Sequence, residues 1–122
     1  MLQSFIFSDL PDGTTKRLIA RLNELGMKSA LDNLYWLPVP NVLLSSLQME
    51  HYLTCGPYRM ALELDKNTVT LELLTRALNT LHCECIAPAS AALRTHMIDW
   101  LDGFILAAIT LPHEAPSSST EP

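Results

Sequence analysis

Apolar residues recur at helical spacing in two segments of the chain. Between residues 14 and 25 they fall at i, i+1, i+4 and i+7, which predicts an amphipathic helix that Gly26 ends. Between residues 90 and 110 they fall at i, i+4, i+7, i+8, i+11 and i+15, and the run from 104 to 109 is apolar on every side. An end of this kind must be buried, either within the chain or against a partner.

A capping motif predicts a third, shorter helix. Ser45 is followed three residues later by Gln48, the spacing of a capping box. The helix would extend to about Cys55, because Gly56-Pro57 is a stop signal.

Alternating and β-branched stretches predict the strands. The two runs on either side of 65–67 fit a hairpin, although residues 71–81 also carry apolar residues at helical spacing. The run at 81–86 alternates and is expected to form a further strand. The first apolar run is either a short strand or an extended arm. The expected strand segments are 5–7, 34–37, 58–64, 68–73 and 81–86.

These elements predict a single α+β domain over residues 1–111. A small antiparallel sheet of three to four strands, packed against two or three helices, is the simplest way to bury their apolar faces. Residues 112–122 are rich in serine and proline and are expected to form a disordered tail.

The charge of the chain argues against several classes of partner. Thirteen acidic and eight basic residues give a net charge of −5, and the basic residues are scattered. Nucleic acids and anionic membranes bind mainly to clustered positive charge, so neither is an expected partner. No apolar run approaches the roughly 20 residues of a membrane span, and no secretory signal is visible. Three cysteines, an odd number, then favour reduced thiols in the cytoplasm.

The cysteines are the best candidates for chemistry. On a strand, Cys83 and Cys85 would point to the same side, and His51 and Cys55 would share a helix face at i, i+4. Together the four fit a tetrahedral zinc site with three sulfur ligands and one nitrogen ligand. Their spacings are not those of the usual zinc motifs, however, and free cysteine is also a common core residue. A disulfide from Cys55 to Cys83 or Cys85, or a cysteine nucleophile, are further alternatives.

The remaining pattern favours association over catalysis. No glycine-rich phosphate loop and no nucleophilic triad is present. We therefore expect a non-enzymatic, cytoplasmic protein-interaction module, with an adaptor, chaperone-like or regulatory role, that forms a homodimer through the apolar C-terminal helix. The candidate interaction residues are Tyr35, Trp36, Trp100, Phe104, Ile105 and Ile109.

Two other functions stay open from the sequence. The first is a small zinc-binding or thiol-redox protein built on Cys55, Cys83 and Cys85, with His51 as an additional ligand. The second is an enzyme whose active site forms between subunits. Its polar groups would come from Arg59, Arg76, His82 and Glu84.

Overall fold

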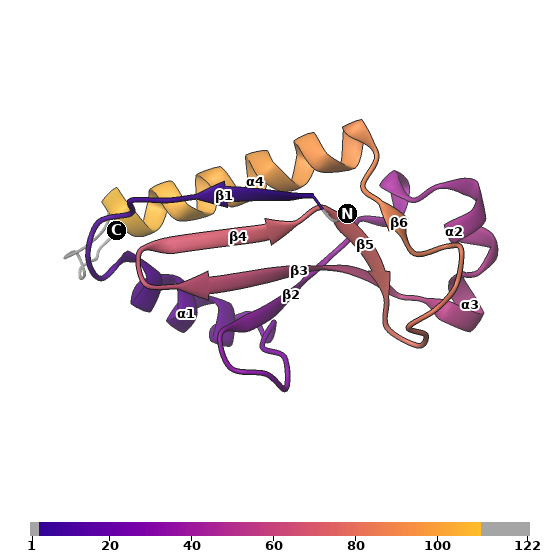
Figure 1. Ribbon diagram of the computed structural model, residues 1–122, viewed down its shortest axis with the longest axis horizontal. Coiled ribbons are helices and arrows are strands. Elements are labelled where there is room, and N and C mark those ends of the chain that lie inside the picture. The colour runs from indigo at the N-terminus through magenta and orange to yellow at the C-terminus, as the bar shows by residue number, and fades with distance from the viewer. Residues whose placement is uncertain (1–2, 111–122) are drawn as a thin grey trace, which may run out of the picture.

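A computed structural model describes residues 3–110 as one antiparallel sheet with helices packed on it (Figure 1). The expected α+β class is confirmed. A 3-10 turn covers Asn41–Leu43. The strands are β1 (Ser4–Phe7), β2 (Leu34–Pro38), β3 (Tyr58–Asp65), β4 (Thr68–Glu72), β5 (Leu74–Ala77) and β6 (Ala87–Pro88), and the helices are α1 (Thr14–Glu24), α2 (Ser46–Glu50), α3 (Tyr52–Cys55) and α4 (Ala91–Thr110).

Strand β3 organises the sheet. It pairs with β2 along one side, and with β4 and then β5 along the other. Only Leu73 separates β4 from β5, and β1 and β6 add to the outer sides of β4 and β5. The expected hairpin of β3 and β4 is confirmed, and the helical alternative for residues 71–81 is wrong.

The structure corrects the number of strands and two of the expected elements. The sheet contains six strands instead of three to four, because the single predicted strand at 68–73 continues past Leu73 as β5, and β6 adds two residues. Residues 81–86 form no strand but a loop. The helix expected from Ser45 to Cys55 is divided at His51 into α2 and α3.

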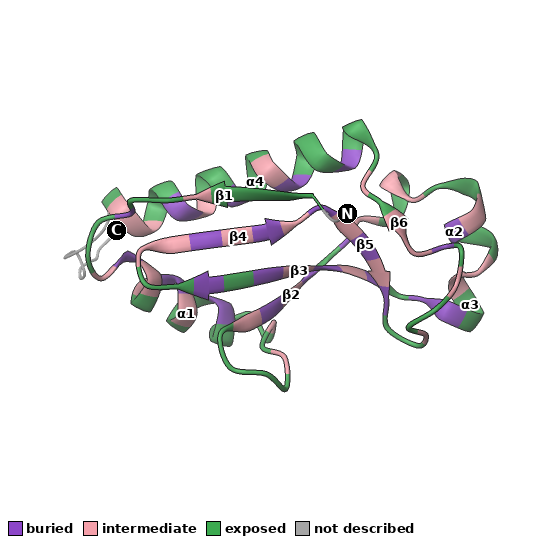
Figure 2. Ribbon diagram, viewed as in Figure 1, coloured by how far each residue is buried: buried purple, intermediate pink, exposed green. Residues whose placement is uncertain are grey.

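The core lies between one face of the sheet and the helices α1 and α4. Alternate residues of β3 and β4 are buried, as Figure 2 shows by the change of colour along each strand. Arg17 of α1 donates a 2.8 Å hydrogen bond to the carbonyl of Ala108 near the end of α4. Helix α4 packs against this core with one stripe of buried side chains. The stripe consists of Leu93, Met97, Leu101 and Ile105.

The opposite face of the sheet carries no described helix and looks toward the viewer in Figure 1. Its side chains alternate with the core residues of the same strands, and they are half-buried or exposed. None of the described helices combines the length and the apolar character that a bilayer-spanning segment needs. The predicted tail at 112–122 lies outside the described residues.

Candidate metal centre

The α2–α3 segment presents the first two candidate ligands. The Ser45 hydroxyl accepts from the Gln48 amide, and the Gln48 side chain accepts from the Ser45 amide, so the predicted capping box is confirmed. The helical hydrogen bonds continue across the break, because the Cys55 amide donates to the His51 carbonyl at 2.7 Å. His51 and Cys55 therefore remain one turn apart and on one side of the segment.

Gly56 lets the chain leave this segment abruptly for β3. A Cβ atom at Gly56 would lie 2.8 Å from the carbonyl oxygen of Tyr52, which is too close for any side chain. The glycine thus allows α3 to end at Cys55, with Gly56 as the residue that follows the helix.

The loop between β5 and β6 presents the other two candidate ligands. The Ile86 amide donates to the Cys83 carbonyl at 2.9 Å, which closes a turn that contains Cys85. The loop is anchored to the helical segment, because the Asn79 amide donates to the carbonyl of Cys55 and its side-chain amide donates to the carbonyl of Gly56. Cys83 and Cys85 are therefore brought together by a turn, not by the strand that the sequence suggested.

The four side chains converge on one point. The Nδ1 atom of His51 lies 3.2 Å from the Cys83 sulfur and 3.9 Å from the Cys55 sulfur, and these two sulfurs are 3.8 Å apart. With Cys85 included, all four candidate ligand atoms lie within 4.8 Å of one another. His51, Cys55, Cys83 and Cys85 together are called the HC₃ cluster below.

The spacing of these atoms suits a tetrahedral metal ion. With zinc–sulfur bonds of about 2.3 Å and zinc–nitrogen bonds of about 2.0 Å, tetrahedral geometry separates the ligand atoms by roughly 3.5–3.8 Å. The distances among His51, Cys55 and Cys83, at 3.2, 3.8 and 3.9 Å, bracket this range, so small rotations of these side chains would bring the three ligand atoms to coordination distance.

Burial and hydrogen bonding divide the thiols into two kinds. Cys55 is buried, and this burial, together with the neighbouring thiols of Cys85 and Cys83, raises its pKa to about 11. Cys83 is half-buried, and a hydrogen bond from the backbone of Cys85 is the main cause that lowers its pKa to about 7. Cys83 therefore becomes a thiolate, the form that binds metals, more readily than Cys55.

Polar neighbours hold the HC₃ cluster in place. The buried side-chain amide of Gln48 donates to the carbonyl of Cys85 at 3.0 Å, and the hydroxyl of Tyr58 donates to the carbonyl of Gln48 at 2.9 Å. Burial and the nearby Cys85 thiol raise the pKa of Tyr58, so this hydroxyl stays protonated as a donor. Neither Gln48 nor Tyr58 was a sequence candidate. Only the capping pattern pointed to Gln48.

The other candidate residues are scattered. Tyr35 and Ile105 are buried in the core and offer no surface to a partner, whereas Trp36 lies on the open side of the sheet. Trp100 is 38 % exposed and stacks on Phe104, and Phe104 and Ile109 are half-buried on α4.

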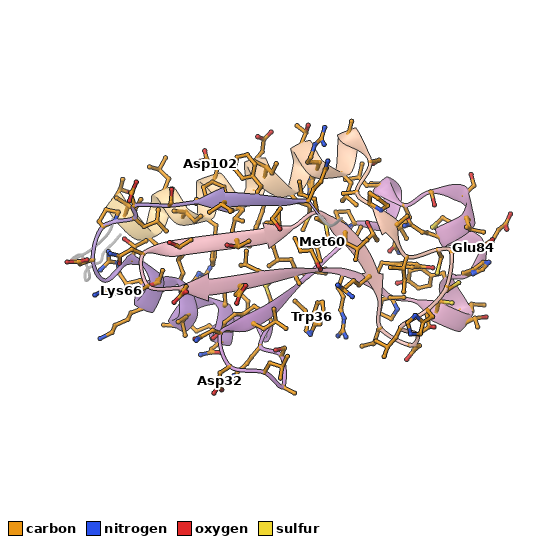
Figure 3. The ribbon with its side chains drawn as sticks, viewed as in Figure 1. Asp32, Trp36, Met60, Lys66, Glu84 and Asp102 are labelled. Atoms are coloured by element: carbon orange, nitrogen blue, oxygen red, sulfur yellow. The ribbon has the colours of Figure 1, made fainter. Side chains whose placement is uncertain are left out.

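The residues of the inter-subunit enzyme hypothesis do not meet at one place. Arg59 and Arg76 are direct neighbours across β3 and β5. His82 and Glu84 are exposed on the loop after β5, and Figure 3 shows Glu84 at the end of the molecule remote from β4.

No protein-family model matches the chain, and no curated protein or solved structure is significantly similar to it. The case for a function therefore depends on the residues themselves.

Proposed function

We propose that this protein is a zinc-binding domain in which the HC₃ cluster holds one structural zinc ion. The observation that carries the proposal is the convergence of three sulfur atoms and one imidazole nitrogen within 4.8 Å. These atoms come from segments as far apart in the sequence as His51 and Cys83, which are separated by 32 positions.

The donor set selects both the metal and its role. Thiolate and imidazole are soft or borderline ligands, and four of them in a tetrahedron favour zinc over magnesium or calcium. Because all four positions would be filled by protein side chains, none would remain for a water or a substrate, which is the property of structural sites. The ion would fasten the β5–β6 loop to α3. Since the site needs reduced thiols, we place the protein in a reducing compartment such as the cytoplasm.

Metal analysis of two matched histidine variants tests this proposal. Native mass spectrometry of the protein, purified without chelator, should show one zinc per chain. His51→Ala should lose the ion, while His82→Ala, which changes an exposed histidine on the neighbouring loop, should keep it. Cobalt(II) added to the metal-free protein should give the visible absorption of a tetrahedral thiolate complex.

Two results would count against the zinc site. The first is a metal-free chain that also fails to bind added zinc or cobalt with its thiols reduced. The second is equal zinc binding by His51→Ala and the wild type. A disulfide between Cys55 and Cys83 in a chain that binds no metal would support the thiol-redox alternative instead.

A second function that we propose is non-enzymatic protein association through α4, in an adaptor, chaperone-like or regulatory role. It is supported by the rings of Trp100 and Phe104, which stack at a centroid distance of 4.8 Å on the outer part of the helix. Two shallow hollows, of about 230 and 140 Å³, lie beside these two rings. Aromatic residues next to hollows are common anchors of interfaces.

A hydrophobic fluorescent probe tests whether these rings form a binding surface. Trp100→Ala should reduce the binding of 8-anilinonaphthalene-1-sulfonate several-fold. Leu106→Ala is the matched control, because Leu106 is 55 % exposed on the same helix but does not belong to the stacked pair. Equal probe binding by the two variants would show that Trp100 is not part of a specific binding surface.

A further inference from the structure

The open face of the sheet is hollowed at its centre. By "open face" we mean the side chains of β2 to β5 that point away from α1 and α4 (Figure 3). A hollow of about 410 Å³ lies over Ala61, the smallest side chain of this face, and Trp36 stands directly opposite Ala61 across the strands. The other residues that line the hollow are Ser4, Leu31, Leu34, Glu63, Thr70, Glu72 and Arg76.

Charges on this face are ordered in rows across the strands. The row on one side of Ala61 contains Pro38, Arg59 and Arg76, which are register partners. The row on the other side contains Leu34, Glu63 and Thr70. One row is therefore positive and the other negative. The row between them contains Trp36 and Ala61 and continues on β4 with Glu72, whose charge is paired with Arg76.

Arg59 and Glu63 have no partner of opposite charge within the described part of the chain. The two ion pairs found in residues 3–110 involve other residues, and one of them binds Arg76 to Glu72 at 2.7 Å. Arg59 stacks on Trp36, with its Cζ atom 3.8 Å from the centroid of the ring, and its Nε atom is buried without an acceptor. Arg59 and Glu63 are four residues apart on one strand, roughly 13 Å, so they cannot pair with each other.

We propose that the open face binds a second copy of this chain, face to face, around a two-fold axis that crosses the strands along the row of Trp36 and Ala61. This operation exchanges the positive row and the negative row. Arg59 of each chain then lies over Glu63 of the other, and the guanidinium gains a carboxylate of opposite charge. A symmetric interface requires such self-complementarity.

The shape of the face agrees with this arrangement. Two sheets pack face to face at about 10 Å and at roughly −30° to each other. The small side chain of Ala61 leaves room for the Trp36 rings, which come together near the axis. Leu31 and Ile6, which are 64 % and 58 % exposed, lie near the edges of the face and would lose contact with water.

A charge-exchange experiment on the purified full chain tests the dimer. Light scattering coupled to size-exclusion chromatography should show a dimer for the wild type. In R59E two glutamates would face each other, and in E63R two arginines would. Each variant alone should therefore dissociate, with a dissociation constant raised by roughly a hundredfold. An equimolar mixture of R59E and E63R restores both ion pairs and should form a heterodimer.

Each other outcome overturns the proposal. A wild-type chain that stays monomeric at high micromolar concentration excludes the dimer. A dimer that persists in R59E and is lost in Trp100→Ala assigns the interface to α4 instead. Failure of the mixture to associate, with both variants folded by circular dichroism, shows that Arg59 and Glu63 do not meet. The HC₃ cluster is unchanged in all of these variants, so none of the results depends on the zinc proposal.

Discussion

The Nδ1 atom of His51 lies 3.2 Å from the sulfur of Cys83, although the two residues are 32 positions apart in the sequence. Two local structures produce this contact. The continued helical hydrogen bonds keep His51 above Cys55, and the turn closed by Ile86 presents Cys83 to both. The contact therefore joins the connection between β2 and β3, which contains α2 and α3, to the loop between β5 and β6.

Removing one ligand should weaken zinc binding much more than removing a neighbouring polar group. We expect Cys83→Ser to lower zinc affinity by at least a hundredfold, because a hydroxyl is a far weaker ligand than a thiolate. The matched control is Thr80→Ala, which removes a hydroxyl from the same loop. Competition with a chromophoric zinc chelator measures both affinities, and similar values for the two variants would contradict the assignment of Cys83.

Thiol reactivity in the metal-free protein should depend on pH in a defined way. The thiolate is the reactive form, and the pKa of Cys83 is lowered to about 7, so its alkylation rate should increase as the pH rises through 7. Cys55, with a pKa raised to about 11 and a buried sulfur, should remain unmodified through this range. Iodoacetamide labelling followed by peptide mass spectrometry separates the residues.

Two further measurements complete the labelling experiment. In denaturant the three cysteines should react alike, with ordinary thiol pKa values. Zinc should protect all three in the folded chain. Faster labelling of Cys55 than of Cys83 in the folded, metal-free chain would contradict the description of the site.

Gln48 should stabilise the fold around the HC₃ cluster. Gln48→Ala removes the hydrogen bond to the Cys85 carbonyl and the side-chain half of the capping box, so we expect a loss of about 1–3 kcal/mol in the free energy of unfolding. Met49→Ala is the control, because Met49 is half exposed on the same short helix. Urea denaturation of the zinc-loaded chains gives the comparison. Equal stability would show that Gln48 does not support the loop.

Arg17 should stabilise the end of α4. Its Nε atom donates to the Ala108 carbonyl at 2.8 Å, where the helix dipole favours a positive charge. Arg17→Ala should therefore cost about 1–2 kcal/mol in the free energy of unfolding. Lys16→Ala changes the exposed cation next to it and should lower the free energy of unfolding by about 0.5 kcal/mol at most. Thermal unfolding followed by circular dichroism distinguishes the two.

The sequence predicted the elements with a strong local signal. The period of α1, the capping box at Ser45 and the alternation of β3 and β4 each depend on residues close together in the chain, and all three are present. The division at His51 and the loop at 81–86 were missed. The alternation of Leu81 to Ile86 suggested a strand, but strand formation needs a partner edge, and the register of β5 and β6 leaves this segment outside the sheet.

The candidate site was predicted in composition but not in geometry. The four ligands were named from the i, i+4 spacing of His51 and Cys55 and from the alternation of Cys83 and Cys85. The first argument holds, since the two residues share one side of the helical segment. The second gave the right residues for a wrong reason, because a turn and not a strand joins them. The support from Gln48 and Tyr58 depends on long-range packing, which no local pattern reports.

The β5–β6 loop is tied to the rest of the chain by backbone and amide hydrogen bonds that involve no ligand side chain, such as those of Asn79 and Gln48. The hydrophobic core contains Cys55 and Cys85, but most of its residues are apolar side chains of the sheet, α1 and α4. The chain should consequently fold first and acquire its ion afterwards, unlike small zinc fingers, which stay unfolded until the metal arrives. The fraction of chains that hold zinc would then depend on the zinc concentration around them, while the fraction of folded chains would stay the same.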